Sequence, residues 1–106
     1  MSPLMHKTIA ALEEIYDPEL PINIVELGLI YEIKELKPDT IQVVMTITTP
    51  HCPAAAFLPE QVRQAIQEAT AIIDIRIEVS FSPRWSREFM SASAKQKLGY
   101  KQFQHT

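Results

Sequence analysis

The residues best suited to chemistry lie in one short segment, Thr48-Thr49-Pro50-His51-Cys52-Pro53. Proline is favoured at the first position of a helix, so Pro53 places Cys52 at the helix N-cap. The free backbone N–H groups of a helix N-terminus favour the thiolate form of a cysteine, and a protonated His51 nearby would act in the same direction. The segment therefore predicts a reactive or metal-ligating cysteine. The alternative is a small hydrophobic side chain that fills the core.

Cys52 is the only cysteine in the chain, which limits what it can do alone. One thiol cannot form an internal disulfide or supply four thiolates to a metal. A histidine adjacent in sequence is also poorly placed to act as the aligned base of a cysteine hydrolase. With only two glycines, Gly28 and Gly99, the chain has no Gly-rich phosphate loop. Any metal held by Cys52 must therefore be shared with a second chain, a partner or a small molecule.

A second candidate is Asp17-Pro18-Glu19, in which a proline separates two carboxylates. Carboxylate oxygens could ligate a metal or influence a nearby thiol. The same residues are also typical of a turn that ends a helix.

Trp85 and Met90 form a third candidate, because Trp85 lies in the loop after the third predicted strand and Met90 starts the short helix predicted next. An aromatic residue in such a loop can anchor a partner protein. It can equally close the open end of a small core, and we expect Trp85 to do this.

Hydrophobic periodicity predicts the elements that must position these residues. The expected helices cover Met5 to Tyr16, a second segment from Pro53, directly after the Cys52 cap, to about Ala69, and Met90 to Leu98, and the expected strands cover 29–37, 40–49 and 73–81. The result is a two-layer α+β domain of order α-β-β-α-β-α, with a three-stranded sheet and helices on one face. We expect one domain over residues 1–99 and a flexible tail over 100–106. The partner of the third strand stays open.

The charge pattern excludes several kinds of partner. The chain has 106 residues and a formal charge of −3, and no segment concentrates lysine and arginine. It also has no apolar run of about 18 residues, and its first residues lack a basic segment followed by an apolar one. We therefore expect no nucleic-acid or membrane partner, and we expect a cytoplasmic protein.

Several strings together resemble a known family. They are Ala11-Leu12, Asp17-Pro18-Glu19, the segment 23–31, the segment 48–53, Pro83-Arg84-Trp85, Met90-Ser91 and Leu98-Gly99. In this order and spacing they resemble the iron–sulfur cluster assembly factors. That family includes the SufT-like bacterial proteins, the PaaD-like proteins and the eukaryotic cytosolic iron–sulfur targeting proteins.

The resemblance assigns roles to individual residues. It implies that Cys52 is the functional thiol, and that Asp17, Glu19 and Thr49 belong to the functional loops. The chain departs from the family at His51, where glycine is common, and this histidine adds a possible nitrogen ligand.

The function implied is a non-enzymatic maturation factor of the SUF type. It would deliver a transient iron–sulfur cluster or iron, shared between chains or with a partner, or would recruit acceptor proteins as an adaptor. The expected partners are the iron–sulfur assembly machinery, acceptor apo-proteins and a second copy in a homodimer. The alternative is a thiol-redox protein or sensor that uses a low-pKa Cys52.

Overall fold

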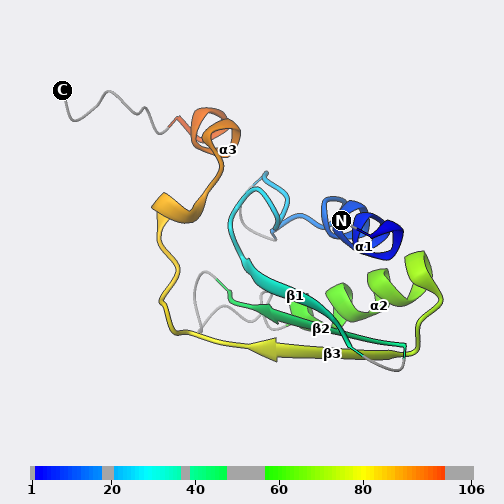
Figure 1. Ribbon diagram of the computed structural model, residues 1–106. Helices are drawn as coiled ribbons and strands as arrows, with labels where there is room; N and C mark the ends of the chain where they lie inside the picture. Colours follow the sequence, from blue (N-terminus) through cyan, green and yellow to red (C-terminus); the bar gives the residue numbers. More distant parts are fainter. Residues whose placement is uncertain (1, 18–20, 37–38, 48–56, 100–106) are drawn as a thin grey trace.

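A computed structural model describes residues 2–17, 21–36, 39–47 and 57–99. The elements follow in the order α1 (Pro3–Leu12), β1 (Ile30–Leu36), β2 (Thr40–Met45), α2 (Leu58–Thr70), β3 (Asp74–Val79), the 3₁₀ helix η2 (Arg87–Phe89) and α3 (Ala92–Lys97). This is the α+β order that the sequence predicts, with η2 in addition (Figure 1). The predicted tail over 100–106 lies outside the described residues.

The sheet contains both strand directions, in the order β1-β2-β3. β1 and β2 form an antiparallel hairpin, and β2 and β3 pair in parallel. A parallel pair needs a crossover connection, which α2 supplies. β2 is therefore the central strand, and this resolves the partner of β3.

The core lies between the sheet and the helices that cover one of its faces (Figure 1). Alternate residues of β2, namely Ile41, Val43 and Met45, are fully buried, as their period of two predicts. The whole buried set is Leu12, Ile22, Ile24, Leu27, Leu29, Ile41, Val43, Met45, Leu58, Val62, Ile66, Ile75, Met90 and Ala94. Four of these come from residues 21–29, so this loop packs into the core.

α1 begins earlier than the hydrophobic pattern predicts. The Ser2 hydroxyl accepts a hydrogen bond of 3.0 Å from the Met5 N–H, and Pro3 occupies the first turn. Ser followed by Pro is a common helix start, so the signal was present in the sequence.

α1 also ends earlier, at Leu12 instead of Tyr16. Tyr16 forms a β-bridge with Asn23, and the Ile24 N–H donates to the Ile15 carbonyl at 2.8 Å. This pairing takes the backbone groups that a further helical turn would use. The predicted boundary was wrong because these contacts do not follow helical periodicity.

β3 is shorter than the predicted strand, and the predicted dry face is only partly dry. Ile75 is 7% exposed, but Ile73 is 84% and Phe81 46% exposed. Both residues lie outside the strand, because Ile73 precedes β3 and Phe81 follows it. In Figure 1 the chain after β3 runs beyond the first turn of α2. Alternation therefore indicates burial only where the helix covers the sheet.

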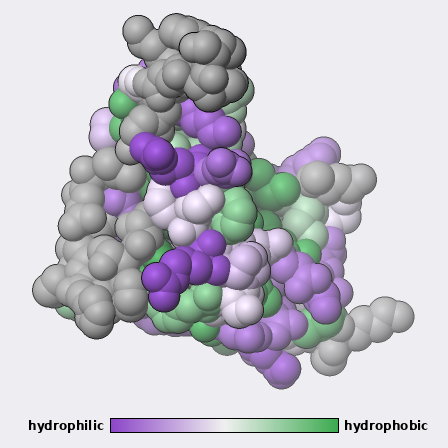
Figure 2. Space-filling model, turned by 90° about the vertical axis from the view of Figure 1, so that its left-hand side faces the viewer, coloured by the Kyte–Doolittle hydropathy of each residue, from purple (hydrophilic) through white to green (hydrophobic). Residues whose placement is uncertain are grey.

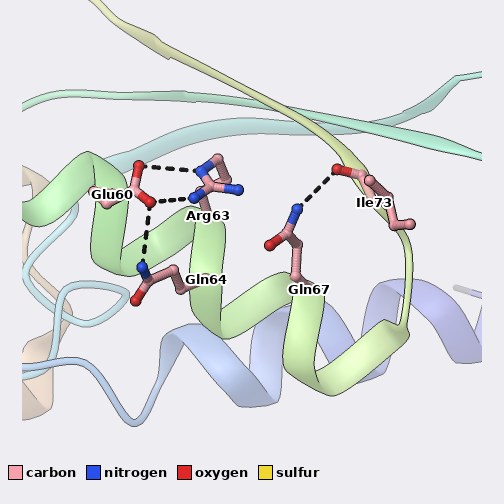
Figure 3. Close-up of polar contacts among 5 residues, drawn as sticks. All are labelled: Glu60, Arg63, Gln64, Gln67 and Ile73. Carbon is pink, nitrogen blue, oxygen red and sulfur yellow. Dashed lines mark hydrogen bonds and ion pairs between the residues drawn. The ribbon is translucent and has the colours of Figure 1, made fainter.

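The outer face of α2 is polar and carries a small hydrogen-bond network (Figure 3). The Glu60 carboxylate accepts hydrogen bonds from Arg63 and Gln64, and the bonds from Arg63 hold the pKa of Glu60 below its ordinary value. The Gln67 amide donates to the Ile73 carbonyl at 2.8 Å. This last bond fixes the turn between α2 and β3.

Candidate functional site

The topology brings the described parts of the predicted functional segments to one end of the sheet. β1 starts at the end where β2 finishes, because the two are antiparallel, and β3 finishes there because it is parallel to β2. Residues 21–29 lead into β1 at this end, and residues 80–91 follow β3 (Figure 1). We call this the site end: the start of β1, the ends of β2 and β3, the start of α2, and residues 21–29 and 80–91.

The loop 21–29 is held in place by its own hydrogen bonds. The Asn23 side-chain oxygen accepts from the N–H groups of Val25 and Glu26, at 3.0 and 2.9 Å. Asparagine commonly stabilises a turn in this way. The Leu29 carbonyl then accepts from the Thr46 N–H at 2.8 Å, which joins the loop to the end of β2.

The C-terminal segment packs directly on this loop. The Trp85 indole N–H donates to the Leu27 carbonyl at 2.8 Å. The Ser91 N–H donates to the Glu26 carbonyl at 2.8 Å, and the Ser91 hydroxyl donates to the Glu26 carboxylate at 3.2 Å. Two segments about 60 residues apart in sequence therefore form one unit.

Gly28 allows this close approach. A Cβ at this position would lie 2.4 Å from the carbonyl oxygen of Phe89, and the backbone has φ +84°. Both conditions favour glycine.

A shallow cleft of about 610 Å³ opens beside this contact, with Tyr31 and Phe89 among its lining residues. Their rings meet edge to face with centroids 5.8 Å apart, and the Tyr31 hydroxyl donates to the Pro83 carbonyl at 2.8 Å. Figure 2 faces the site end and shows apolar surface beside polar surface. Val79, Phe81 and Phe89 are each more than a third exposed there. Such a surface suits contact with another protein.

The structure places only some of the predicted site residues. Asp17 is 5% exposed, and its N–H donates to the Ile22 carbonyl, so it lies beside the loop 21–29. Glu19, Thr49, His51 and Cys52 lie outside the described residues. Their roles stay predictions.

The N-cap of the second helix is also not where the sequence places it. α2 begins at Leu58, and its N-cap residue is Phe57. The capping position predicted for Cys52 is therefore not confirmed.

Trp85 and Met90 differ in what they can offer a partner. Trp85 is half-buried and packs against the core, which agrees with a residue that closes one end of it. Met90 is 5% exposed and belongs to the core, so it has almost no surface for a partner. Sequence reasoning did not predict the contacts of Tyr31, Phe89 and Ser91, which join distant segments.

One ion pair lies at the opposite end of the sheet from the site end, because Asp74 is the first residue of β3. The Asp74 carboxylate accepts hydrogen bonds from Arg76 and, at 3.0 Å, from Thr40, and these bonds hold the pKa of Asp74 below its ordinary value. Within residues 2–17, 21–36, 39–47 and 57–99, no three His, Cys, Asp or Glu side chains gather closely enough to hold a metal. None of the helices in these ranges is long and apolar enough to cross a bilayer.

We expect Ser91→Ala to lower the free energy of unfolding by about 1–2 kcal/mol. The change removes the N-cap bond from the Ala94 N–H, at 3.0 Å, and the bond to the Glu26 carboxylate. Urea unfolding measures the loss. Ser86→Ala is the control, because the Ser86 hydroxyl accepts from the Glu88 N–H within its own turn. Equal losses in both variants would contradict a stabilising link between Ser91 and Glu26.

Comparison with known proteins gives consistent matches. The family model described as iron-sulfur cluster assembly protein matches residues 7–80. A Porphyromonas gingivalis protein named Fe-S protein maturation auxiliary factor is 37% identical over 92 residues, which are 87% of this chain and 88% of the relative. A Bacillus subtilis protein, also named as an Fe-S protein maturation auxiliary factor, is 33% identical over 96 residues, which are 91% of this chain and 94% of the relative. The crystal structure of a domain of unknown function from Bacillus anthracis has a TM-score of 0.84 and 33% identity, and covers 92% of this chain and 93% of that one.

Proposed function

Because the chain belongs to the iron–sulfur cluster assembly protein family, we propose that it is a non-enzymatic maturation factor that delivers a cluster to acceptor proteins. The observation that carries the proposal is similarity along nearly the whole chain to proteins of similar length named as maturation auxiliary factors. The likeness is therefore not confined to one shared module of a larger enzyme.

In this proposal the cluster is cargo, and Cys52 is a transient ligand to it. A [2Fe–2S] cluster needs four ligands, and one chain offers a single thiolate. His51 adds a possible nitrogen ligand, and the remaining ligands come from a partner or a small thiol. An incomplete ligand set of this kind suits transfer, because the acceptor can replace the external ligands one at a time.

The proposal assigns acceptor docking to the site end. The support is the apolar surface there and the contact between Trp85 and the Leu27 carbonyl. Through this contact Trp85 holds the loop 21–29 in position. A change at Trp85 therefore alters the docking surface through the loop 21–29, although the indole itself is half-buried.

We expect capture and transfer to separate in two variants. Cys52→Ser should capture an apo [2Fe–2S] ferredoxin as well as the wild type does, but should transfer at most about a tenth as much cluster, because serine is a poor ligand to iron–sulfur clusters. Trp85→Ala should weaken capture at least about tenfold. Binding of the labelled apo-ferredoxin and the rise of its visible absorbance measure the two steps.

Trp85→Phe is the control, since it keeps an aromatic ring but loses the bond to Leu27. If Cys52→Ser transfers cluster at the wild-type rate, delivery through this thiol is wrong and the adaptor role remains. If neither variant changes capture or transfer, acceptors do not use the site end.

A further inference from the structure

β1 lies at an edge of the sheet, with β2 on one side and, among the described residues, no strand on the other. A groove of about 570 Å³ follows this edge between α1 and β1. Most of its lining side chains are apolar, and Met5, Ile9 and Ile33 are only half-buried in it. A free strand edge beside an apolar groove is a surface that proteins usually cover.

The charges on β1 indicate what could cover it. Glu32 and Lys34 flank Ile33 and lie on the solvent face, with Nζ and Oε2 3.7 Å apart. If a second copy pairs antiparallel and centred on Ile33, Glu32 lies opposite the partner's Lys34, and Lys34 lies opposite the partner's Glu32. Opposite charges in facing positions stabilise a strand pair.

Other registers are less favourable. If the pair is centred on Glu32, that residue faces the Glu32 of the other copy. If it is centred on Lys34, that residue faces the Lys34 of the other copy, so like charges meet in both registers. A slip of one residue places Ile33 on the solvent face of one copy. The sequence of β1 is therefore complementary to itself in one register.

We propose that two copies of this chain pair through β1, antiparallel and centred on Ile33. The two sheets then form one continuous sheet, and each groove is covered by Ile33 and α1 of the other copy. The pairing has two-fold symmetry, as closed homodimers do. It does not depend on the proposed function.

The dimer has a consequence for the site end. β1 starts at the site end, and its seven residues span roughly 20 Å. In an antiparallel pair the two site ends therefore lie at opposite ends of the shared edge. Two copies joined in this way do not bring their site ends together around one cluster.

β3 provides a comparison within the same chain, because Arg76 and Glu78 flank Ile77 in a similar pattern. Arg76 interacts with Asp74 at 3.3 Å, and the apolar groove described above adjoins β1. These observations favour the β1 edge, and variants in β3 serve as controls.

Sedimentation equilibrium tests the proposal with the full chain. The wild type should be a dimer at tens of micromolar, and Lys34→Glu should raise the dimer dissociation constant about tenfold or more, because it places like charges opposite each other twice. The double change Glu32→Lys with Lys34→Glu restores the opposite charges and should restore the dimer. Arg76→Glu should have no effect.

A wild type that is monomeric at these concentrations would overturn the proposal. So would a dimer that Lys34→Glu leaves unchanged, or one that Arg76→Glu dissociates instead. Circular dichroism of each variant shows whether the fold is retained. Rescue by the double change separates lost pairing from lost stability.

Cross-linking provides a second measurement. In a Cys52→Ser background, Ile33→Cys should form a disulfide between copies under mild oxidation, because facing residues have Cβ atoms about 5 Å apart. Ile77→Cys in the same background should form little disulfide between copies. Equal cross-linking at both positions, or none at residue 33, would contradict pairing through β1.

Discussion

Gly28→Ala should lower the free energy of unfolding by about 3 kcal/mol or more, the largest loss of stability that we expect from a single methyl group in this chain. At φ +84° an alanine is strained, which costs about 1–2 kcal/mol. The added Cβ would also lie 2.4 Å from the Phe89 carbonyl oxygen, and 2.7 Å from the Phe89 carbonyl carbon and Cβ. Backbone atoms cannot rotate away, so the segment around Phe89 must shift and weaken the contacts of Trp85 and Ser91 with the loop.

Gly99→Ala is a closely matched control for this prediction. Gly99 has φ +81°, nearly the same as Gly28, but an added Cβ would meet nothing within 4 Å. It should therefore cost only the strain of the backbone. Urea unfolding of both variants isolates the effect of close packing. Losses of the same size would show that the approach of Gly28 to Phe89 contributes nothing.

The parts of the fold that could be predicted depend on local patterns. The alternation of Ile41, Val43 and Met45 is visible in sequence and corresponds to a strand with one buried face. The spacing of Leu58, Val62 and Ile66 predicts α2 in the same way, and these residues are buried. Local periodicity is sufficient where one face of an element meets the core.

The parts that could not be predicted depend on contacts between distant residues. The end of α1 is determined by pairing between Tyr16 and Asn23, and the position of Trp85 by the carbonyl of Leu27, 58 residues earlier. No periodicity encodes such contacts. A glycine before a strand, as at Gly28, was the one local sign that another backbone approaches there.

The candidate site was predicted unevenly for the same reason. The composition of the segment 48–53 indicates its chemistry, but the helix that follows is capped at Phe57, five residues after Cys52. Met90 lies in the core as its spacing predicts, but α3 starts at Ala92 and not at Met90. Its predicted role in docking has little surface to support it. Residue type predicts what a side chain can do, whereas packing determines whether a partner can reach it.

Cys52→Ala should reduce the iron and acid-labile sulfide retained after anaerobic reconstitution to the level of a protein-free control. The chain has no second cysteine, and the described residues bring no three metal-ligating side chains together, so neither a second thiolate nor a metal site among those residues can replace this thiolate. In the dimer proposed here, the two site ends lie apart, so the second copy does not complete the ligand set. The wild type should therefore hold cluster only when a small thiol such as glutathione is present.

His51→Ala provides an intermediate case for this last prediction, because it removes a possible nitrogen ligand and leaves the thiolate. Retained iron should fall below the wild-type value but stay above that of Cys52→Ala, as measured by iron and sulfide assays and visible absorbance. Equal iron content in the wild type and Cys52→Ala would exclude direct cluster binding through Cys52. Cluster binding by the wild type without any added thiol would instead indicate that two chains share it, and would contradict the separation of site ends that pairing through β1 requires.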